Sequence, residues 1–207
     1  MAKQKYIPAL SAGWLTPLYD TLVEGPMSAL RMRKDLLGLA GDLNGKKILD
    51  VGCGTGTLAL MIKRANPTAE IAGLDGDPQI LEIARRKAKE EGLEIRFEQG
   101  MSYSLPYPGE SFDMVTTSLM LHHLGREDKQ NTAVEMYRVL HHGGHLIGID
   151  FAQTRNLIGA ALHPFERVAD NVDGFLPAMF QAAGFTDFAE ARRYVFRTIA
   201  LFQASKP

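Results

Sequence analysis

The sequence predicts a three-layer α/β fold with a mostly parallel sheet that ends in an antiparallel hairpin. Two observations predict it. From Lys46 onward, short apolar or β-branched runs alternate with longer amphipathic runs, which is typical of parallel strands joined by helices. Near the C-terminus, two strand-like runs follow each other with almost no room for a helix, and such a direct connection favours an antiparallel pair. Ligands of this kind of sheet bind at the carboxyl ends of the strands.

The elements follow in order along the chain. Prolines and glycines break up the segment that starts at Tyr6, and helical spacing begins at Ser28 and continues to Leu39. We then expect strands at Ile48–Val51, Glu70–Leu74, Glu94–Glu98, Asp113–Thr117 and Leu146–Asp150, and helices at Leu58–Ala65, Pro78–Glu91, Asp128–Leu140 and Phe175–Ala183. The last two strands are expected near Phe188–Val195 and Phe196–Ala204. The Pro78–Glu91 helix is amphipathic and is closed by Gly92; its apolar face comprises Ile80, Leu81, Ala84 and Ala88.

Composition excludes several classes of protein. The chain has 207 residues, 45% of them hydrophobic and 23% charged, which suits one globular domain with a full core. A formal net charge of −1 with mixed signs argues against nucleic acid or a polybasic membrane surface as the main partner. The single cysteine, Cys53, allows no intrachain disulfide, and no apolar run approaches the roughly 20 residues of a membrane span. With no signal peptide over Met1–Leu10, we expect a cytoplasmic protein.

A glycine-rich loop carries the main functional signal. Gly52, Gly54 and Gly56 follow the first strand and precede a helix, where the backbone must turn sharply and approach a ligand without a Cβ in the way. The spacing is G-x-G-x-G, unlike the G-x-G-x-x-G of dinucleotide enzymes. Asp50 stands two positions before the first glycine, and Asp75 ends the second strand, where a carboxylate can accept both ribose hydroxyls of an adenosine.

With these elements the chain resembles the class I, Rossmann-like S-adenosylmethionine-dependent methyltransferases, in particular the ubiquinone/menaquinone-biosynthesis group. The matching stretches are Ile48–Gly56, Gly73–Pro78, Gly100–Asp113 and Tyr137–Gly144. The resemblance implies a seven-stranded sheet in the order 3-2-1-4-5-7-6 with an antiparallel C-terminal strand, and S-adenosylmethionine as cofactor with S-adenosylhomocysteine as product. It also implies one domain over residues 1–207, with a helical lid or substrate segment at 1–42 and a cofactor-binding core at 43–207.

The resemblance assigns roles by position. The glycine loop packs against the methionine and ribose parts of the cofactor, Asp75 binds the ribose, and Gly76 and Ile80 line the adenine pocket. Met101 departs from the family, which has an acidic residue there for the adenine amino group; we expect Met101 to pack on the adenine face and the Ser102 backbone N–H to serve the ring. The expected cofactor-binding residues are Asp50, Gly52, Cys53, Gly54, Gly56, Asp75, Gly76, Ile80, Gly100, Met101, Ser102 and Ser118.

Structural interpretations stand beside several of these assignments. Asp75 also suits a strand end or helix cap, and Asp113 is better explained by fixing the start of the fourth strand. Gly143 and Gly144 suit a turn into the fifth strand. Cys53 suits a small side chain that fills the loop, because methyl transfer needs no protein nucleophile.

The acceptor site is expected on three segments over the carboxyl ends of the strands: Tyr6–Met32, Ser118–Leu124 and Phe151–Phe175. No catalytic residue is assigned; the candidates are His122, His123, His163 and Tyr19, and a structural or pocket-wall role suits His122 and His123 better. Tyr19 with Asp20 resembles a tyrosine–aspartate pair found before the core in this group, although Trp14 and Tyr19 equally suit a packed lid helix. His163 lies with Phe165 and Arg167.

The flanking segments favour a small, partly apolar acceptor such as a ring compound or a quinone-like precursor. We expect Arg31 and Arg33 to be solvated, with anion binding as the alternative if the acceptor carries a carboxylate or phosphate. Histidines and acidic residues are not spaced as a metal set, so no metal is predicted. The predicted function is methyl transfer to this small molecule by in-line displacement, in which the chain orients the acceptor and excludes water. A general base is needed only where the acceptor must lose a proton. Two alternatives stay open, a non-catalytic module that keeps the cofactor pocket and a nicotinamide-dependent oxidoreductase.

Overall fold

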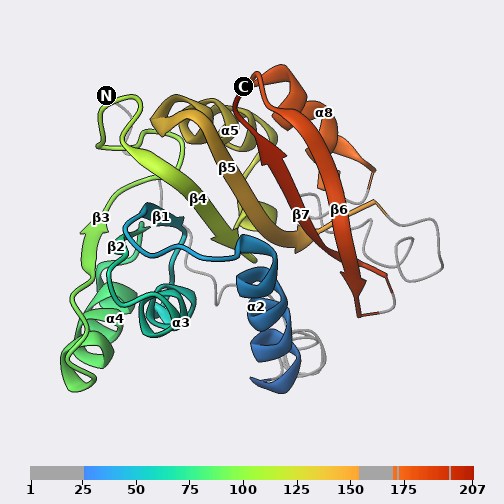
Figure 1. Ribbon diagram of the computed structural model, residues 1–207. Helices are drawn as coiled ribbons and strands as arrows, with labels where there is room; N and C mark the ends of the chain where they lie inside the picture. Colours follow the sequence, from blue (N-terminus) through green and yellow to red (C-terminus); the bar gives the residue numbers. More distant parts are fainter. Residues whose placement is uncertain (1–25, 154–169, 172, 196) are drawn as a thin grey trace.

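A seven-stranded sheet in the order β3-β2-β1-β4-β5-β7-β6 forms the middle of the molecule (Figure 1). The computed structural model describes residues 26–153, 170–171, 173–195 and 197–207. The strands are β1 (Lys47–Val51), β2 (Glu70–Asp75), β3 (Arg96–Gln99), β4 (Phe112–Ser118), β5 (Leu140–Phe151), β6 (Thr186–Tyr194) and β7 (Ile199–Ser205). The strands β1 to β5 pair in parallel, whereas β7 runs antiparallel to both β5 and β6. The predicted strand order and terminal hairpin are confirmed.

Helices cover both faces of the sheet and give the three predicted layers. They are α2 (Pro26–Ala40), α3 (Thr57–Ala65), α4 (Pro78–Glu90), η1 (Leu121–His123), α5 (Arg126–Val139) and α8 (Phe175–Ala182). One buried cluster joins α2, α3 and α4 to the sheet face that carries Ile48 and Ile71. A second joins α5 and α8 to the other face, which carries Leu49 and Val115. Neighbouring residues of β1 thus enter opposite cores, as the twofold repeat of a strand requires.

The helix α4 shows how local signals set an element's ends. Asp77 caps its N-terminus, where the carboxylate accepts from the backbone N–H of Gln79 at 2.8 Å and of Ile80 at 3.4 Å. Pro78 occupies the first turn, where its missing N–H costs nothing. At this end of the helix Ile80 is partly exposed, while Leu81, Ala84 and Ala88 are buried in the core.

The fifth strand differs from the prediction, because β5 begins at Leu140 and not at Leu146. Leu140 pairs with Phe112 and His145 pairs with Met114, so the register shifts between them and extra β5 residues bulge out. Gly144 lies inside this bulge, where a Cβ would come 2.8 Å from the His141 carbonyl oxygen. The glycine pair is therefore part of a bulged strand and not a turn before it.

The remaining boundaries shift by a few residues. The strand β3 begins two residues later than predicted, at Arg96, and α5 begins two residues earlier, at Arg126. Asp113 plays the structural part expected of it, since its Oδ2 accepts from the backbone N–H of Lys47 at 2.8 Å and ties the starts of β4 and β1 together. Within the described residues, no helix has both the length and the apolar character needed to cross a membrane.

Candidate active site

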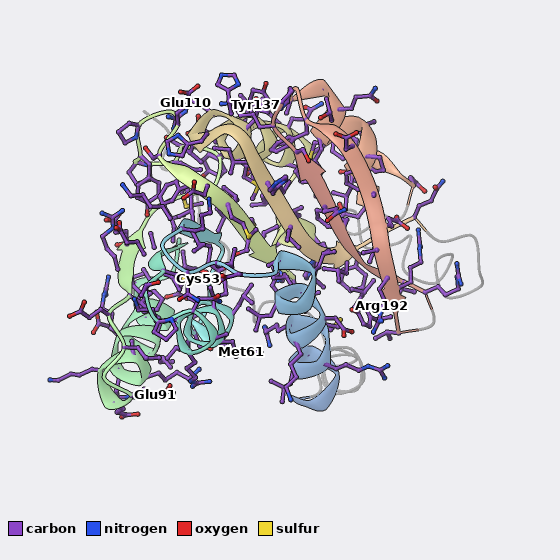
Figure 2. The ribbon with its side chains drawn as sticks, in the orientation of Figure 1. Cys53, Met61, Glu91, Glu110, Tyr137 and Arg192 are labelled. Atoms are coloured by element: carbon purple, nitrogen blue, oxygen red, sulfur yellow. The ribbon has the colours of Figure 1, made fainter. Side chains whose placement is uncertain are left out.

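A cavity of about 420 Å³ opens at the carboxyl ends of β1, β2 and β4. Eleven of the twelve residues expected to bind a cofactor line it: Asp50, Gly52, Cys53, Gly54, Asp75, Gly76, Ile80, Gly100, Met101, Ser102 and Ser118. Figure 2 labels Cys53, which lies at the end of β1 where the glycine loop turns toward α3. These eleven residues come from four separate stretches of sequence that parallel strands bring to one edge.

Backbone hydrogen bonds lock the glycine loop onto the neighbouring strand. The N–H groups of Gly52 and Cys53 both donate to the Leu74 carbonyl oxygen, at 2.8 and 3.0 Å. The next amide, that of Gly54, donates to Asp75 Oδ2 at 2.9 Å. Because β2 also supplies Asp75, the loop and the carboxylate form one rigid unit.

The three loop glycines are required for different reasons. All have positive φ, between 54° and 73°, a region that suits glycine. A Cβ on Gly52 would collide with the Met120 side chain, which packs over the loop from the segment after β4. At Gly54 nothing lies within 4 Å of the Cβ position, so open cavity space stands over its backbone. Gly56 does not line the cavity; a Cβ there would come 2.9 Å from the Phe97 ring, so packing explains this glycine, and its expected cofactor contact is not seen on the wall.

Asp75 is held with its carboxylate at the cavity. Its Oδ2 accepts from Gly54 and its Oδ1 accepts from the Asp77 backbone N–H at 3.0 Å. Each carboxylate oxygen has a further lone pair, so Asp75 can still accept two hydroxyl groups. The strand-end interpretation of Asp75 is correct as far as it goes, but the helix cap is Asp77.

Asp50 lies at the floor of the cavity and is 1% exposed. Its Oδ1 accepts from the Thr116 hydroxyl at 3.0 Å, and its Oδ2 makes no hydrogen bond within the described residues. Burial raises the pKa of the Asp50 carboxyl to about 7, with a further rise from the Asp75 charge, while the Thr116 bond and the Arg33 charge act in the opposite direction. An unsatisfied buried carboxylate oxygen beside a cavity suits a cationic ligand group.

Arg33 is a site residue that sequence reasoning missed. We expect both arginines of α2 to be solvated, and Arg31 is exposed, but Arg33 lines the cavity together with Ala29 from the same helix. Helical spacing alone could have placed Ala29 and Arg33 on one face of the helix, because they are four positions apart. It does not say which edge of the sheet that face covers.

The segment after β3 supplies another part of the wall. Ser104 N–H donates to the Met101 carbonyl oxygen at 3.0 Å, which closes a tight turn. The hydroxyl groups of Ser102 and Thr132 lie 2.9 Å apart and join the turn to α5. Because the Ser102 hydroxyl is engaged in this way, a ligand in the cavity would contact the backbone of Ser102 and not its hydroxyl. Leu119, Met120 and Leu124, from the expected acceptor segment Ser118–Leu124, also line the cavity. Further wall residues that the sequence analysis did not assign are Thr55, Thr57, Leu58, Leu74, Tyr103, Gly125 and Asp128.

Cys53 is a buried thiol, and its chemistry is suppressed. Burial raises the pKa of the Cys53 thiol far above its usual range, and the nearby carboxylates of Asp50 and Asp75 raise it further. Its sulfur also fills space against β2, where a Cβ on Gly73 would come 3.0 Å from Sγ. The interpretation of Cys53 as a loop filler agrees with this packing.

The two adjacent histidines of η1 have different surroundings. His123 lines the cavity, whereas His122 does not and has its Nδ1 3.0 Å from Asp150 Oδ1. The other two catalytic candidates, Tyr19 and His163, lie outside the described residues, as do Trp14, Asp20, Phe165 and Arg167. In the part of the chain that the structure covers, no three His, Cys, Asp or Glu side chains group as a metal site.

Known proteins share both the sequence and the fold. Residues 48–144 match a family described as methyltransferase domain. A demethylmenaquinone methyltransferase of Thermus thermophilus is 38% identical over 172 residues, which are 81% of this chain and 77% of the relative. The ubiquinone/menaquinone biosynthesis C-methyltransferase of Bdellovibrio bacteriovorus is 32% identical over 152 residues, 72% of this chain and 64% of the relative. The solved YcgJ protein of Bacillus subtilis is 25% identical with a TM-score of 0.68, and covers 80% of this chain and 72% of its own.

Proposed function

Since the chain belongs to the class I S-adenosylmethionine-dependent methyltransferases of the ubiquinone and menaquinone type, we propose that it methylates the ring of a small quinone-type acceptor. The observation that carries the proposal is the unit of glycine loop and Asp75 around the cavity, with open space over Gly54. An adenosine with an amino-acid tail needs such a bare backbone and a carboxylate for its ribose.

The residues present fit this cofactor. Asp75 would accept the ribose hydroxyls, and Ile80 and Met101 would enclose the adenine. Asp50, with its unsatisfied oxygen, suits the positively charged end of the cofactor, and the guanidinium of Arg33 suits the carboxylate of the amino-acid tail. Each charge of the zwitterionic tail would thus lie near a wall residue of opposite charge.

When bound, the cofactor supplies a methyl group that is already activated on a positively charged sulfur. The chain then has to hold the acceptor atom in line with the methyl carbon and to exclude water. Leu119, Met120 and Leu124 give the wall after β4 an apolar character that suits a ring compound. We further propose that residues 1–42 act as the lid or substrate segment and 43–207 as the core, because α2 contributes Ala29 and Arg33 to the wall.

The nicotinamide-dependent oxidoreductase is the weaker alternative. Its dinucleotide-binding sheet ends in parallel strands, whereas β7 inserts antiparallel between β5 and β6. The non-catalytic module is not favoured either, because the relatives are named as methyltransferases and the cavity keeps the charged groups of a cofactor site.

Asp75 provides the direct test of the proposal. Asp75→Asn keeps the side-chain shape but replaces an acceptor oxygen with a donor, so it loses hydroxyl contacts and the charge that holds Gly54. We expect the dissociation constant for S-adenosylhomocysteine, measured by isothermal titration calorimetry, to rise about 10-fold or more, since a hydrogen bond to a charged group contributes about 1.5–3 kcal/mol.

Asp187→Asn is the matched control, because Asp187 is an exposed carboxylate on β6. It should bind as the wild type does. Wild-type protein should also convert S-adenosylmethionine to S-adenosylhomocysteine when a naphthoquinol without a ring methyl group is present. The proposal is overturned if the wild type shows no saturable S-adenosylhomocysteine binding, or if it binds but methylates no hydroxylated ring compound.

A further inference from the structure

We propose that His123 is the general base of the reaction and that Asp150, acting through His122, is its positioning residue. The inference rests on the proposed function, because it needs an acceptor ring that carries a hydroxyl group. The geometry that supports it is a chain of contacts from a fully buried carboxylate to the cavity wall, through two neighbouring histidines of η1.

Asp150 anchors this chain at the end of β5. Its Oδ2 accepts from the Leu121 backbone N–H at 2.7 Å. Its Oδ1 lies 3.0 Å from His122 Nδ1 and accepts from the backbone N–H of Phe151 at 2.8 Å and from Asn171 Nδ2 at 3.2 Å. Burial disfavours the charged carboxylate, but His122 and the two backbone donors outweigh burial and hold the pKa of Asp150 below its usual value. Asp150 is therefore an ionised acceptor at neutral pH.

An ionised Asp150 fixes the orientation of His122. A carboxylate only accepts hydrogen bonds, so Nδ1 of His122 must carry the hydrogen. The His122 ring also packs edge-on against Phe151, with ring centroids 4.8 Å apart. Held from two sides, His122 presents its ring to His123, whose centroid lies 4.0 Å away at an interplanar angle of 40°.

Of the three residues Asp150, His122 and His123, only His123 lines the cavity. It is exposed and lines the same cavity as the glycine loop and Ser118. A neutral imidazole has a ring nitrogen that accepts a proton, so His123 can take up a proton next to the reacting atoms. Without the fixed His122 ring beside it, the exposed His123 ring would have fewer contacts to fix its orientation.

Other titratable groups on the wall suit the task less well. Burial raises the pKa of the Cys53 thiol and of the Tyr103 hydroxyl, so both hold their protons at neutral pH. Asp75 is engaged by two backbone donors, and Asp50 lies at the floor beneath the loop. Asp128 is the one rival base on the wall among the described residues, since it is half-buried at the start of α5.

The proton transfer balances without an oxidant or reductant. His123 removes the proton from a ring hydroxyl of a hydroquinone, and the oxygen electron pair moves into the ring. The neighbouring ring carbon forms a bond to the methyl carbon, and the carbon–sulfur bond breaks with its electron pair left on sulfur. The methylated carbon then loses its hydrogen to solvent as a proton, and the oxygen recovers its proton from His123. A hydroquinone enters and a hydroquinone leaves, with one proton released.

Several charged or titratable groups lie on the elements around the histidine pair and on the cavity wall. They are Asp150 on β5, Asp128, Arg126 and Lys129 on α5, Asp170, which pairs with the last two, Tyr103 after β3, and Arg33, Asp50 and Asp75 elsewhere on the cavity wall. Because the other members of this set are unchanged in a single variant, a change in the pH profile is caused by the one substitution.

The test compares His123→Gln with His145→Gln, using a short-chain prenylated 1,4-naphthoquinol without a ring methyl group as acceptor. His145 is an exposed histidine on the first half of β5, outside the cavity wall, and is the matched control. We expect His123→Gln to lower kcat about 100-fold, as is usual for loss of a general base, and to abolish the fall in rate at acidic pH. Its dissociation constant for S-adenosylhomocysteine should stay within about threefold of the wild type, and imidazole added to His123→Ala should restore part of the rate.

Asp150→Asn separates positioning from a purely structural role. We expect it to lower kcat while leaving cofactor affinity unchanged, and to move the acid limb of the pH profile to lower pH, because the buried negative charge 3.0 Å from His122 is gone. The inference is overturned if His123→Gln is as active as His145→Gln, or if Asp128→Asn and not His123→Gln removes the acid limb. A wild type that binds cofactor but methylates nothing would instead overturn the proposed function.

Discussion

Single residues of the glycine loop divide the work between binding and stability. Gly54 leaves its backbone bare to the cavity, whereas Gly56 leaves room for the Phe97 ring in the core. Both residues have a left-handed backbone, so an added Cβ costs about 1–2 kcal/mol at either one. What differs is where the new methyl group points, and that difference can be measured.

Gly54→Ala and Gly56→Ala should therefore fail in different ways. We expect Gly54→Ala to lower the free energy of unfolding by about 1–2 kcal/mol and to weaken S-adenosylhomocysteine binding about 10-fold or more, because the methyl group enters the cavity. Gly56→Ala should lose at least about 1 kcal/mol more stability than Gly54→Ala, since its Cβ overpacks against Phe97. Urea denaturation and calorimetric binding would check both; equal stabilities for the two variants would contradict the packing argument.

Asp50 links cofactor binding to pH at the same scale. Its pKa is raised from 3.8 to about 7 in the folded protein, so the unfolded chain releases this proton first as pH rises. In the cofactor-free protein, the contribution of Asp50 to the free energy of unfolding thus decreases as pH rises from about 4 to about 7. This stabilising contribution is fully present below about pH 4. A positively charged ligand lowers the pKa of Asp50 again, because it favours the ionised carboxylate.

We accordingly expect S-adenosylmethionine affinity to rise with pH through about pH 7 in the wild type. Below pH 7, binding should release a proton, which calorimetry detects as a dependence of the apparent enthalpy on the buffer's ionisation enthalpy. Asp50→Asn should remove most of this dependence. Identical proton release by the wild type and Asp50→Asn would show that another group carries it.

At the scale of elements, the start of α4 places two aspartates with separate duties side by side. Asp75 ends β2 and faces the cavity, while Asp77 caps the helix two positions later. The backbone N–H of Asp77 also holds Asp75 Oδ1, and this bond survives a change of the Asp77 side chain. The strand–helix junction thus keeps the ligand carboxylate in place independently of the cap.

Asp77→Ala tests this separation. It removes the side-chain acceptor for Gln79 and Ile80, and we expect a loss of about 1 kcal/mol in the free energy of unfolding, as is typical of an N-cap. S-adenosylhomocysteine affinity should change by less than about twofold, in contrast to Asp75→Asn. Thermal unfolding followed by circular dichroism gives the stability, and calorimetry gives the affinity. A large loss of affinity in Asp77→Ala would mean that the cap also orders the site.

For the whole molecule, sequence patterns predict what depends on local periodicity and on chain order. Alternating strand and helix patterns gave the layers, and the missing crossover before the last strand gave the antiparallel β7. The resemblance to a family gave the strand order and eleven residues of the cavity wall. These features are encoded in short windows or in motifs that recur together.

What the sequence could not predict depends on contacts between distant segments. The early start of β5 follows from a bulge that only its pairing with β4 reveals. Arg33 reaches the cavity because α2 lies against the sheet near the glycine loop, a placement that helical spacing does not specify. Likewise, Met120 covers Gly52 from about 70 residues along the chain, and the Asp150–His122 pair joins β5 to η1.

The raised pKa of the Cys53 thiol has a consequence for reactions between this enzyme and quinones. Quinones are electrophiles that add to thiolates and arylate the proteins that carry them, while the protonated thiol reacts far more slowly. A cofactor loop with an ordinary cysteine would risk covalent inactivation whenever a hydroquinone acceptor was oxidised nearby. Burial and the charges of Asp50 and Asp75 keep the Cys53 thiol protonated, which disfavours such an addition at the cofactor loop.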